Sequence, residues 1–150
     1  MLAYKVKLAL AASALTFGLP AGAQVVSGGT EGGVSGEDVS ASTCGYGSTD
    51  GSGTTVGGCA DAEARNGGTA ETSTRAKANE RRAMQRSDAR ARDDDERARS
   101  RTRTVVRNGE VVRSRTMSMY KMKGERPVRE VVSTKATPEG TKTRKKPKGD

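Results

Sequence analysis

The stretch VVRNGEVV, residues 105–112, carries the clearest secondary-structure signal in this chain. Asn-Gly is a favoured two-residue hairpin turn, because both residues tolerate a positive φ. Valine-rich arms flank the turn on both sides, and such β-branched pairs stabilise neighbouring strands. The expected cross-strand pairs are Arg107 with Glu110, Val106 with Val111, and Val105 with Val112. The stretch therefore predicts an antiparallel β-hairpin.

A further strand signal follows the hairpin. Residues 128–132 read VREVV, and the preceding KGERP at 123–127 is typical of a turn. The apolar residues between the two signals, which could pack on the valine face, are Met117, Met119, Tyr120 and Met122. These segments together predict a small antiparallel β-meander near residues 101–133. Three strands are close to the minimum for an independently stable sheet.

The composition argues against one large core. Of the 150 residues, 32% are hydrophobic and 3% aromatic, and the chain contains no Ile or Trp. Every Leu and the single Phe lie within the first nineteen residues. Low hydrophobicity combined with many Gly, Ser, Thr and Arg residues is typical of disordered chains. The predicted fold class is therefore a mostly disordered chain that contains the small meander.

Residues 1–23 have the pattern of a secretory signal peptide. Lys5 and Lys7 precede an uncharged, mostly apolar stretch, and Ala-Gly-Ala at 21–23 is a small-x-small cleavage signal. A transmembrane anchor is the competing interpretation, but the uncharged run is shorter than the ~20 residues that a span needs. We therefore expect an exported protein, periplasmic or secreted, with no membrane span.

Cys44 and Cys59 are the only two cysteines of the chain. In a segment bound for an oxidising compartment, a single pair is expected to form a disulfide. The competing interpretation is a redox-active pair, which usually needs close Cys-x-x-Cys spacing. The distance between these two cysteines along the chain favours a structural bridge.

The bridge would lie in an acidic Gly/Ser/Thr-rich segment, residues 24–64, which holds six acidic residues and no Lys or Arg. Its glycines do not match a phosphate-binding loop, because Gly57-Gly58 is followed by Cys59 instead of Lys. Its acids lack the spacing of a calcium loop. We expect a flexible loop pinned by one disulfide.

Residues 65–104 form a charged, Ala/Arg-rich segment. Ala and Arg are strong helix formers, and opposite charges recur at helical spacing, for example Asp88 with Arg92. No apolar stripe accompanies them, so the segment predicts an exposed, partly formed polar helix near residues 75–99. The segment forms either a basic binding surface or a merely solvated face, and the acidic run at residues 93–96 favours the solvated face. The arginines concerned are Arg81, Arg82, Arg86, Arg90 and Arg92.

The C-terminal part is strongly basic. Residues 65–150 hold 25 Lys and Arg against 12 Asp and Glu, and residues 134–150 form a basic tail that we expect to be disordered. The candidate polyanion-binding residues are Arg81, Arg82, Arg103, Arg113, Arg115, Lys121, Lys123, Arg144, Lys145 and Lys146. Basic residues on the β-meander (105–133) would also serve to protect sheet edges from aggregation.

The chain contains no His, which removes Ser-His-Asp and Cys-His catalysis and His-ligated metals. We expect no catalytic residue, cofactor or metal. The sequence favours a small non-enzymatic protein whose basic half contacts anionic envelope or extracellular polymers or lipid head groups. The alternative is a protein-interaction or assembly partner that folds or adds a strand on binding. Nucleic acid is a less favoured partner, because stacking platforms need several aromatics.

Overall fold

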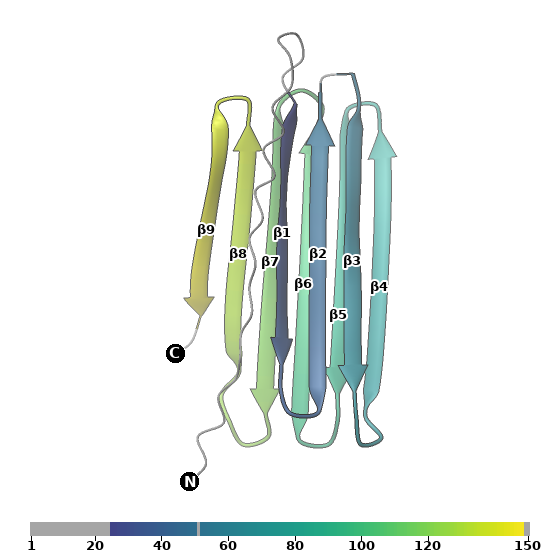
Figure 1. The fold of residues 1–150 in the computed structure, drawn as a ribbon, viewed down its shortest axis with the longest axis vertical. Helices are drawn as coiled ribbons and strands as arrows, with labels where there is room; N and C mark the ends of the chain where they lie inside the picture. The colour runs from purple at the N-terminus through teal and green to yellow at the C-terminus, as the bar shows by residue number, and fades with distance from the viewer. Residues whose placement is uncertain (1–24, 51, 149–150) are drawn as a thin grey trace.

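A computed structural model describes residues 25–50 and 52–148, and that part of the chain folds into β-strands (Figure 1). The strands are β1 (Val26–Ser35), β2 (Val39–Thr49), β3 (Thr54–Ala64), β4 (Thr69–Asn79), β5 (Arg82–Arg92), β6 (Glu96–Arg107), β7 (Val111–Met122), β8 (Val128–Thr137) and β9 (Gly140–Lys148). β1–β3 form a three-stranded sheet and β4–β9 a six-stranded sheet. The smaller sheet packs on the middle of the larger one, so the molecule is a β-sandwich.

Within each sheet, every strand pairs antiparallel with the next strand along the chain. The chain changes sheet between β3 and β4. Asn66 and Gly67 make that change with φ angles of 52° and 79°, a left-handed conformation that suits these two residue types. The Arg65 amide donates to the Asp38 carbonyl at 2.9 Å, which ties this connection to the β1–β2 turn.

The prediction of a mostly disordered chain is therefore wrong. The helix expected near residues 75–99 is also wrong, because that segment forms the end of β4, all of β5 and the start of β6. The acidic segment, expected to be a loop, forms β1–β3, and the tail 134–150 contributes the end of β8 and all of β9. The signal-peptide prediction falls on residues 1–23, which lie outside the described residues.

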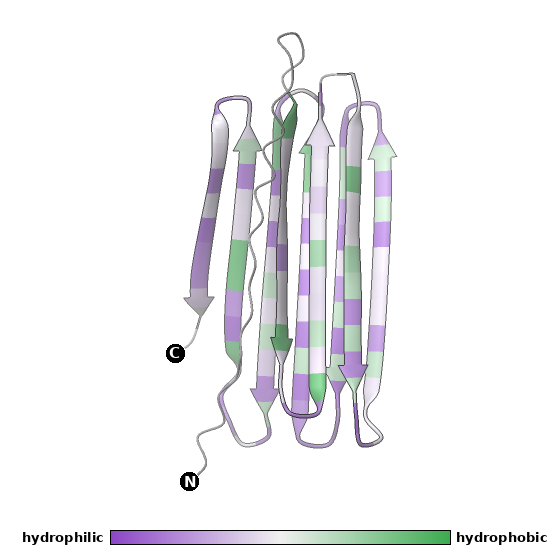
Figure 2. Ribbon diagram, viewed as in Figure 1, coloured by the Kyte–Doolittle hydropathy of each residue, from purple (hydrophilic) through white to green (hydrophobic). Residues whose placement is uncertain are grey.

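Alternation of small and charged residues explains these strands. On β6, Ala98, Ser100 and Thr102 point into the sandwich, and the arginines between them point out. The six-stranded sheet shows the same banding of hydrophilic and hydrophobic positions along several strands (Figure 2). This is the period of two that a half-buried strand requires. Ala and Arg have high helix propensities, but a propensity does not depend on the spacing of the residues. Tertiary packing overrides the helix propensity of this segment.

The hairpin at residues 105–112 is present, but its register differs from the expected one. Arg107 pairs with Val111 and Val106 with Val112, so the loop has three residues, 108–110. Gly109 has a φ of 67°, whereas Asn108 has no positive φ, so the turn is not the mirror-image type that Asn-Gly favours. β6, β7 and β8 follow one another as the expected meander, within a larger sheet.

The interior has three zones along the strands. One end holds an apolar cluster of Val34, Val39, Ala41, Ala89, Ala91, Ala98 and Tyr120. The other end holds a second cluster, Val26, Ala83, Val106, Val112 and Ala136. Between them lies a layer of fully buried hydroxyl side chains, which we call the hydroxyl layer: Thr30, Thr43, Ser100, Thr102, Thr104, Ser114, Thr116 and Ser118.

Hydrogen bonds between the two sheets, and between β6 and β7 within the larger sheet, satisfy the hydroxyl layer. Thr43 on β2 lies 2.7 Å from Ser100 and 2.8 Å from Thr102 on β6, measured between hydroxyl oxygens. Thr116 donates to Thr30 at 2.8 Å and lies 2.5 Å from Thr102. Buried hydroxyls are costly only when unpaired, so this network lets a sandwich form with few large apolar residues.

Glycines on the three-stranded sheet let the two sheets approach closely. A Cβ added at Gly58 would collide with the Gln85 side chain, and one at Gly47 would collide with Val106. The inward positions opposite these glycines therefore carry Gln, Thr or Val side chains that fill the available space. The interior is specified by size as much as by polarity.

A buried carboxylate closes one end of the sandwich. Glu96 accepts a 2.6 Å hydrogen bond from the Tyr120 hydroxyl and a 3.2 Å bond from the Asp38 amide in the β1–β2 turn. Burial, together with the hydrogen bond and charge of Glu96, raises the pKa of the Tyr120 phenol. Gly36 lies against this pair, where a Cβ would collide with both side chains.

Candidate functional site

The outward face of the six-stranded sheet is strongly cationic. Strand register and alternation place every second side chain of β4–β9 on this face, which we call the cationic sheet face. Its Lys and Arg residues are Arg75, Lys77, Arg82, Arg86, Arg90, Arg92, Arg97, Arg99, Arg101, Arg103, Arg107, Arg113, Arg115, Lys121, Arg129, Lys135, Lys142, Arg144 and Lys146. Among the described strand positions on this face, the acidic residues are Glu71 and Asp88.

The opposite outer surface of the sandwich has another character. The outward positions of β1–β3 hold mostly small residues, together with the exposed Tyr46 and the acidic Glu31, Asp61 and Glu63. The charge asymmetry between the two parts of the sequence is thus an asymmetry between two faces of one folded body. Such separation creates a field that draws anions to one side of the molecule.

Asp88 organises the arginines around it. Its carboxylate lies 2.6 Å from Arg101 Nε, 2.8 Å from Arg90 Nε, 3.3 Å from Arg99 and 3.9 Å from Arg86. Burial alone would raise the pKa of Asp88, but hydrogen bonds from Arg90 and Arg101 and the neighbouring charges lower it overall. One carboxylate cannot neutralise four guanidinium groups, so this cluster keeps a net positive charge.

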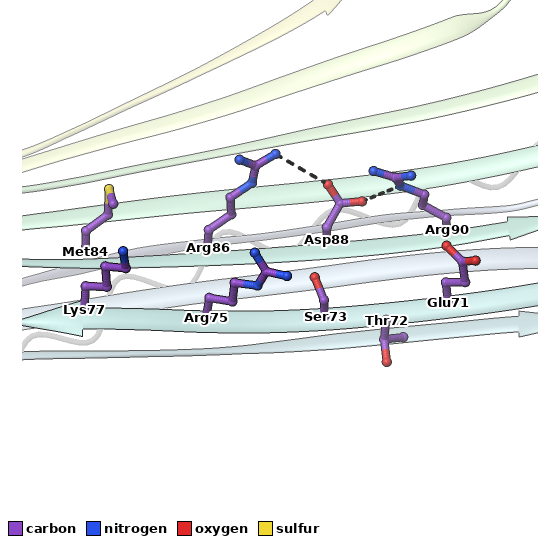
Figure 3. A pocket seen from close by; sticks show the side chains of 9 residues that line it. All are labelled: Glu71, Thr72, Ser73, Arg75, Lys77, Met84, Arg86, Asp88 and Arg90. Atoms are coloured by element: carbon purple, nitrogen blue, oxygen red, sulfur yellow. Dashed lines mark hydrogen bonds and ion pairs between the residues drawn. The ribbon is translucent and has the colours of Figure 1, made fainter.

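Several grooves hollow the cationic sheet face, and one of about 380 Å³ is lined by Arg90, Arg92, Arg97 and Arg99. Two other grooves have a greater volume. The larger, of about 780 Å³, crosses β6–β9 and is lined by Arg101, Arg103, Val105, Arg113, Ser114, Arg115, Met117, Ser133, Thr134, Lys135, Lys142 and Arg144. The second, of about 610 Å³, lies over β4 and β5, where Arg75, Arg86 and Arg90 surround Asp88 (Figure 3). Each groove combines aliphatic surface with guanidinium groups, which suits an anion on a carbon framework.

The structure brings some of the predicted polyanion-binding residues together. Arg103, Arg113, Arg115 and Arg144 all line the larger groove. Lys121, Lys146 and Arg82 lie on the same face, away from that groove.

Three predicted residues lie elsewhere. Arg81 is in the β4–β5 turn. Lys123 is in the β7–β8 loop, where its ammonium group lies 3.1 Å from Asp95. Lys145 points to the inward side of β9, 2.7 Å from the buried Glu130 carboxylate. These three side chains do not extend the cationic sheet face.

The predicted set of polyanion-binding residues omitted several central residues of this face, although Arg86 and Arg90 were considered as part of a basic surface. The omitted residues are Arg75, Arg86, Arg90, Arg99, Arg101, Lys135 and Lys142. A signal for them was present in the sequence. RSRTRT at 99–104 places Arg at every second position, which on a strand puts all of them on one side. A helix was expected near residues 75–99, and on a helix Arg75, Arg86, Arg90 and Arg99 would point in different directions from the helix axis.

The disulfide prediction is confirmed. Cys44 on β2 and Cys59 on β3 are direct register partners, and their bridge lies on the outward side of the three-stranded sheet. Structural disulfides are typical of oxidising compartments. In the described part of the chain, no group of Cys, Asp and Glu side chains is arranged to hold a metal ion.

Comparisons of the chain with family models, curated proteins and solved structures found no match. Residues 25–50 and 52–148 contain no helix that is long and apolar enough to cross a membrane. The functional assignment therefore rests on the chemistry of the faces, and the cationic sheet face is the strongest feature among them.

Proposed function

We propose that this chain is a small exported, non-enzymatic protein that binds anionic polymers of the cell envelope or its surroundings. The cationic sheet face carries the proposal, because guanidinium groups crowd one side of a rigid sheet with two carboxylates among them. Arginine stays charged at any physiological pH and forms paired hydrogen bonds with carboxylate, sulfate and phosphate. Lipid head groups share that chemistry and are the second source of anions.

Export is supported by two independent features. The signal-peptide pattern of residues 1–23 and the Cys44–Cys59 disulfide both fit a protein made for an oxidising compartment. The full-length chain, expressed with its own N-terminus, should be recovered outside the cytoplasm as a species that begins at Gln24. Mass spectrometry of the periplasmic and culture fractions tests this, and an uncleaved cytoplasmic protein would contradict it.

Binding is tested with the oxidised chain, Gln24 to Asp150, and immobilised heparin. Retention should fall steeply as salt rises from about 50 to 200 mM, because counterion release contributes to binding of a polyanion. Neutral agarose is the control, and vesicles with anionic lipids measure the contribution of lipid heads. Weak retention that does not depend on salt would overturn the proposal.

A second candidate is assembly through the β4 edge. β4 pairs only with β5, and every residue on it is exposed. Glu71 and Arg75 lie on the same side of β4, two positions either side of Ser73. Antiparallel pairing of two copies centred on Ser73 would set Glu71 of one copy opposite Arg75 of the other. Sedimentation equilibrium tests this, and a monomer at all concentrations would count against it.

A further inference from the structure

One row of the cationic sheet face runs across the strands as a series of arginines. Arg75 on β4 is the register partner of Arg86 on β5, Arg86 of Arg103 on β6, and Arg103 of Arg115 on β7. Ser133 on β8 continues the row to Arg144 on β9. We call Arg75, Arg86, Arg103, Arg115 and Arg144 the arginine row. Figure 3 shows its first two members, Arg75 and Arg86, side by side.

The arginine row is costly for the folded chain. Like charges directly opposite each other destabilise an antiparallel pair. Asp88 reaches only Arg86 in this row, at 3.9 Å, and its shorter contacts go to Arg101 in its own row and to Arg90 in the row beyond. Within the part of the chain that the structure describes, Arg75, Arg103, Arg115 and Arg144 form no ion pair with a carboxylate. The row therefore presents unneutralised guanidinium groups to an external anion.

The spacing of the row limits the shape of that anion. Neighbouring strands lie about 4.8 Å apart, so six strands place the ends of the row roughly 24 Å apart. The two larger grooves lie along the same line, because Arg75 and Arg86 line one of them and Arg103, Arg115 and Arg144 the other. A linear molecule with repeated anionic groups would follow this line, perpendicular to the strands.

The other residues of the face indicate the chemistry of that molecule. Between the charges lie aliphatic side chains such as Val105, Met117 and Val131. The two described tyrosines are elsewhere: Tyr46 is exposed on the three-stranded sheet, and Tyr120 is buried inside the sandwich. Single-stranded nucleic acids bind to charged grooves that also offer aromatic stacking surfaces. The face offers charge and aliphatic contact, which suit a chain of sugars better than a chain of bases.

We infer that the arginine row binds an unbranched acidic polysaccharide, laid across the strands, through its sulfate or carboxylate groups. Successive sugars of an extended chain advance by a distance close to the strand spacing, so several guanidinium groups would engage anionic groups at once. Each contact would be a charge-assisted, two-pronged hydrogen bond. The inference rests on the proposed function and specifies its ligand class and orientation.

The test compares two double variants that remove the same charge. R103Q/R115Q breaks the middle of the row, whereas R82Q/R107Q removes another pair of arginine register partners from the same face, outside the grooves lined by Arg75, Arg92 and Arg103. Heparin fragments graded in length are titrated against each protein by calorimetry at fixed salt. The row variant should lose about tenfold in affinity, equal to about 1.4 kcal/mol, and the control about two- to threefold. Affinity should rise with fragment length until the fragment spans the sheet.

The outcomes separate the inference from the proposed function. Equal losses of heparin affinity in the two variants would show that the face attracts anions only through its overall charge. That result would contradict the arginine row as a specific site but would leave the proposed polyanion binding intact. Failure of the unaltered protein to bind heparin would overturn both. Tighter binding to single-stranded DNA than to heparin of equal charge would overturn the polysaccharide. Polygalacturonate carries only carboxylates, which are neutralised in acid, whereas the sulfates of heparin stay charged. Binding that survives at low pH is therefore directed to sulfate, and binding that is lost is directed to carboxylate.

Discussion

On β6, Ser100 and Thr102 point into the sandwich, and their chain neighbours Arg101 and Arg103 point out of it. The inward residues have no freedom of size, because the other sheet lies directly against them and satisfies their hydroxyls. The outward residues have more freedom of size, and of the two only Arg101 is paired with a carboxylate, that of Asp88. The two faces of one strand thus differ in what constrains them: the inner face must pack closely, and we propose that the outer face binds an anionic partner. The predictions below test that division.

The largest effect is expected where the sheets approach most closely. Gly58→Val would drive a side chain into Gln85 and the Cys44 carbonyl, and should lower the free energy of unfolding by about 3 kcal/mol. Gly53→Val is the matched control, because no atom lies near the position of its Cβ. Urea unfolding of both variants measures the difference. Similar stabilities would show that the glycines do not hold the sheets together.

Removing a hydroxyl from the hydroxyl layer should cost somewhat less. Thr102→Val keeps the shape of the side chain but leaves Thr43 and Thr116 each with one partner fewer, for an expected loss of about 2 kcal/mol. Ser133→Ala, on the outward face, is the control and should change stability by less than about 0.5 kcal/mol. If Thr102→Val left the free energy of unfolding unchanged, the hydroxyl layer would tolerate an apolar side chain at this position.

Acid should weaken the Asp88 cluster by a smaller amount. The pKa of Asp88 is lowered in the folded chain. The Asp88 carboxylate therefore stabilises the fold fully above the unfolded-state pKa of about 3.9, and this stabilisation is lost as the pH falls from there through the folded-state pKa. Solvent screening of the surrounding arginines limits the effect to about 1 kcal/mol or less. Unfolding of the unaltered chain and of Asp88→Asn from pH 5 to pH 2 measures it. The two curves should converge at low pH, and parallel curves would contradict the role of Asp88.

The smallest effect has the opposite sign. R103Q/R115Q relieves repulsion between adjacent arginines and should raise the free energy of unfolding by a few tenths of a kcal/mol. The same change weakens heparin binding, so stability and binding should move in opposite directions. Thermal unfolding without ligand provides the measurement. A clear loss of stability would show that these arginines support the fold, which would remove the contrast between the two faces.

The sequence predicted part of this architecture. The turn at Asn108-Gly109, the strands around it, the Cys44–Cys59 bridge and the sign of the charge on the C-terminal part were all readable from local patterns. The strand at residues 128–132 was readable as well, but the remaining strands were not, because hydrophobicity was taken as the measure of burial. Strands such as β2 and β5 bury Gly, Ala, Ser, Thr and Gln, whose contribution depends on cross-sheet hydrogen bonds that no local pattern reveals.

The candidate site was predictable in kind but not in layout. Single arginines such as Arg103 and Arg115 were selected for their charge, and Lys145 was selected for the same reason although it faces inward. Which arginines become neighbours depends on the register of six strands. A shift of one residue would move each of them to the other face of its strand.

The alternation of charged and small residues has a consequence for the chain before it folds. A typical aggregation-prone segment joins high hydrophobicity to low net charge. β5 and β6 carry Arg at every second or nearly every second position, so identical strands stacked in register would place guanidinium groups on top of one another. The chain thus encodes its own protection against amyloid-like association, and its unfolded form should stay dispersed long enough to refold.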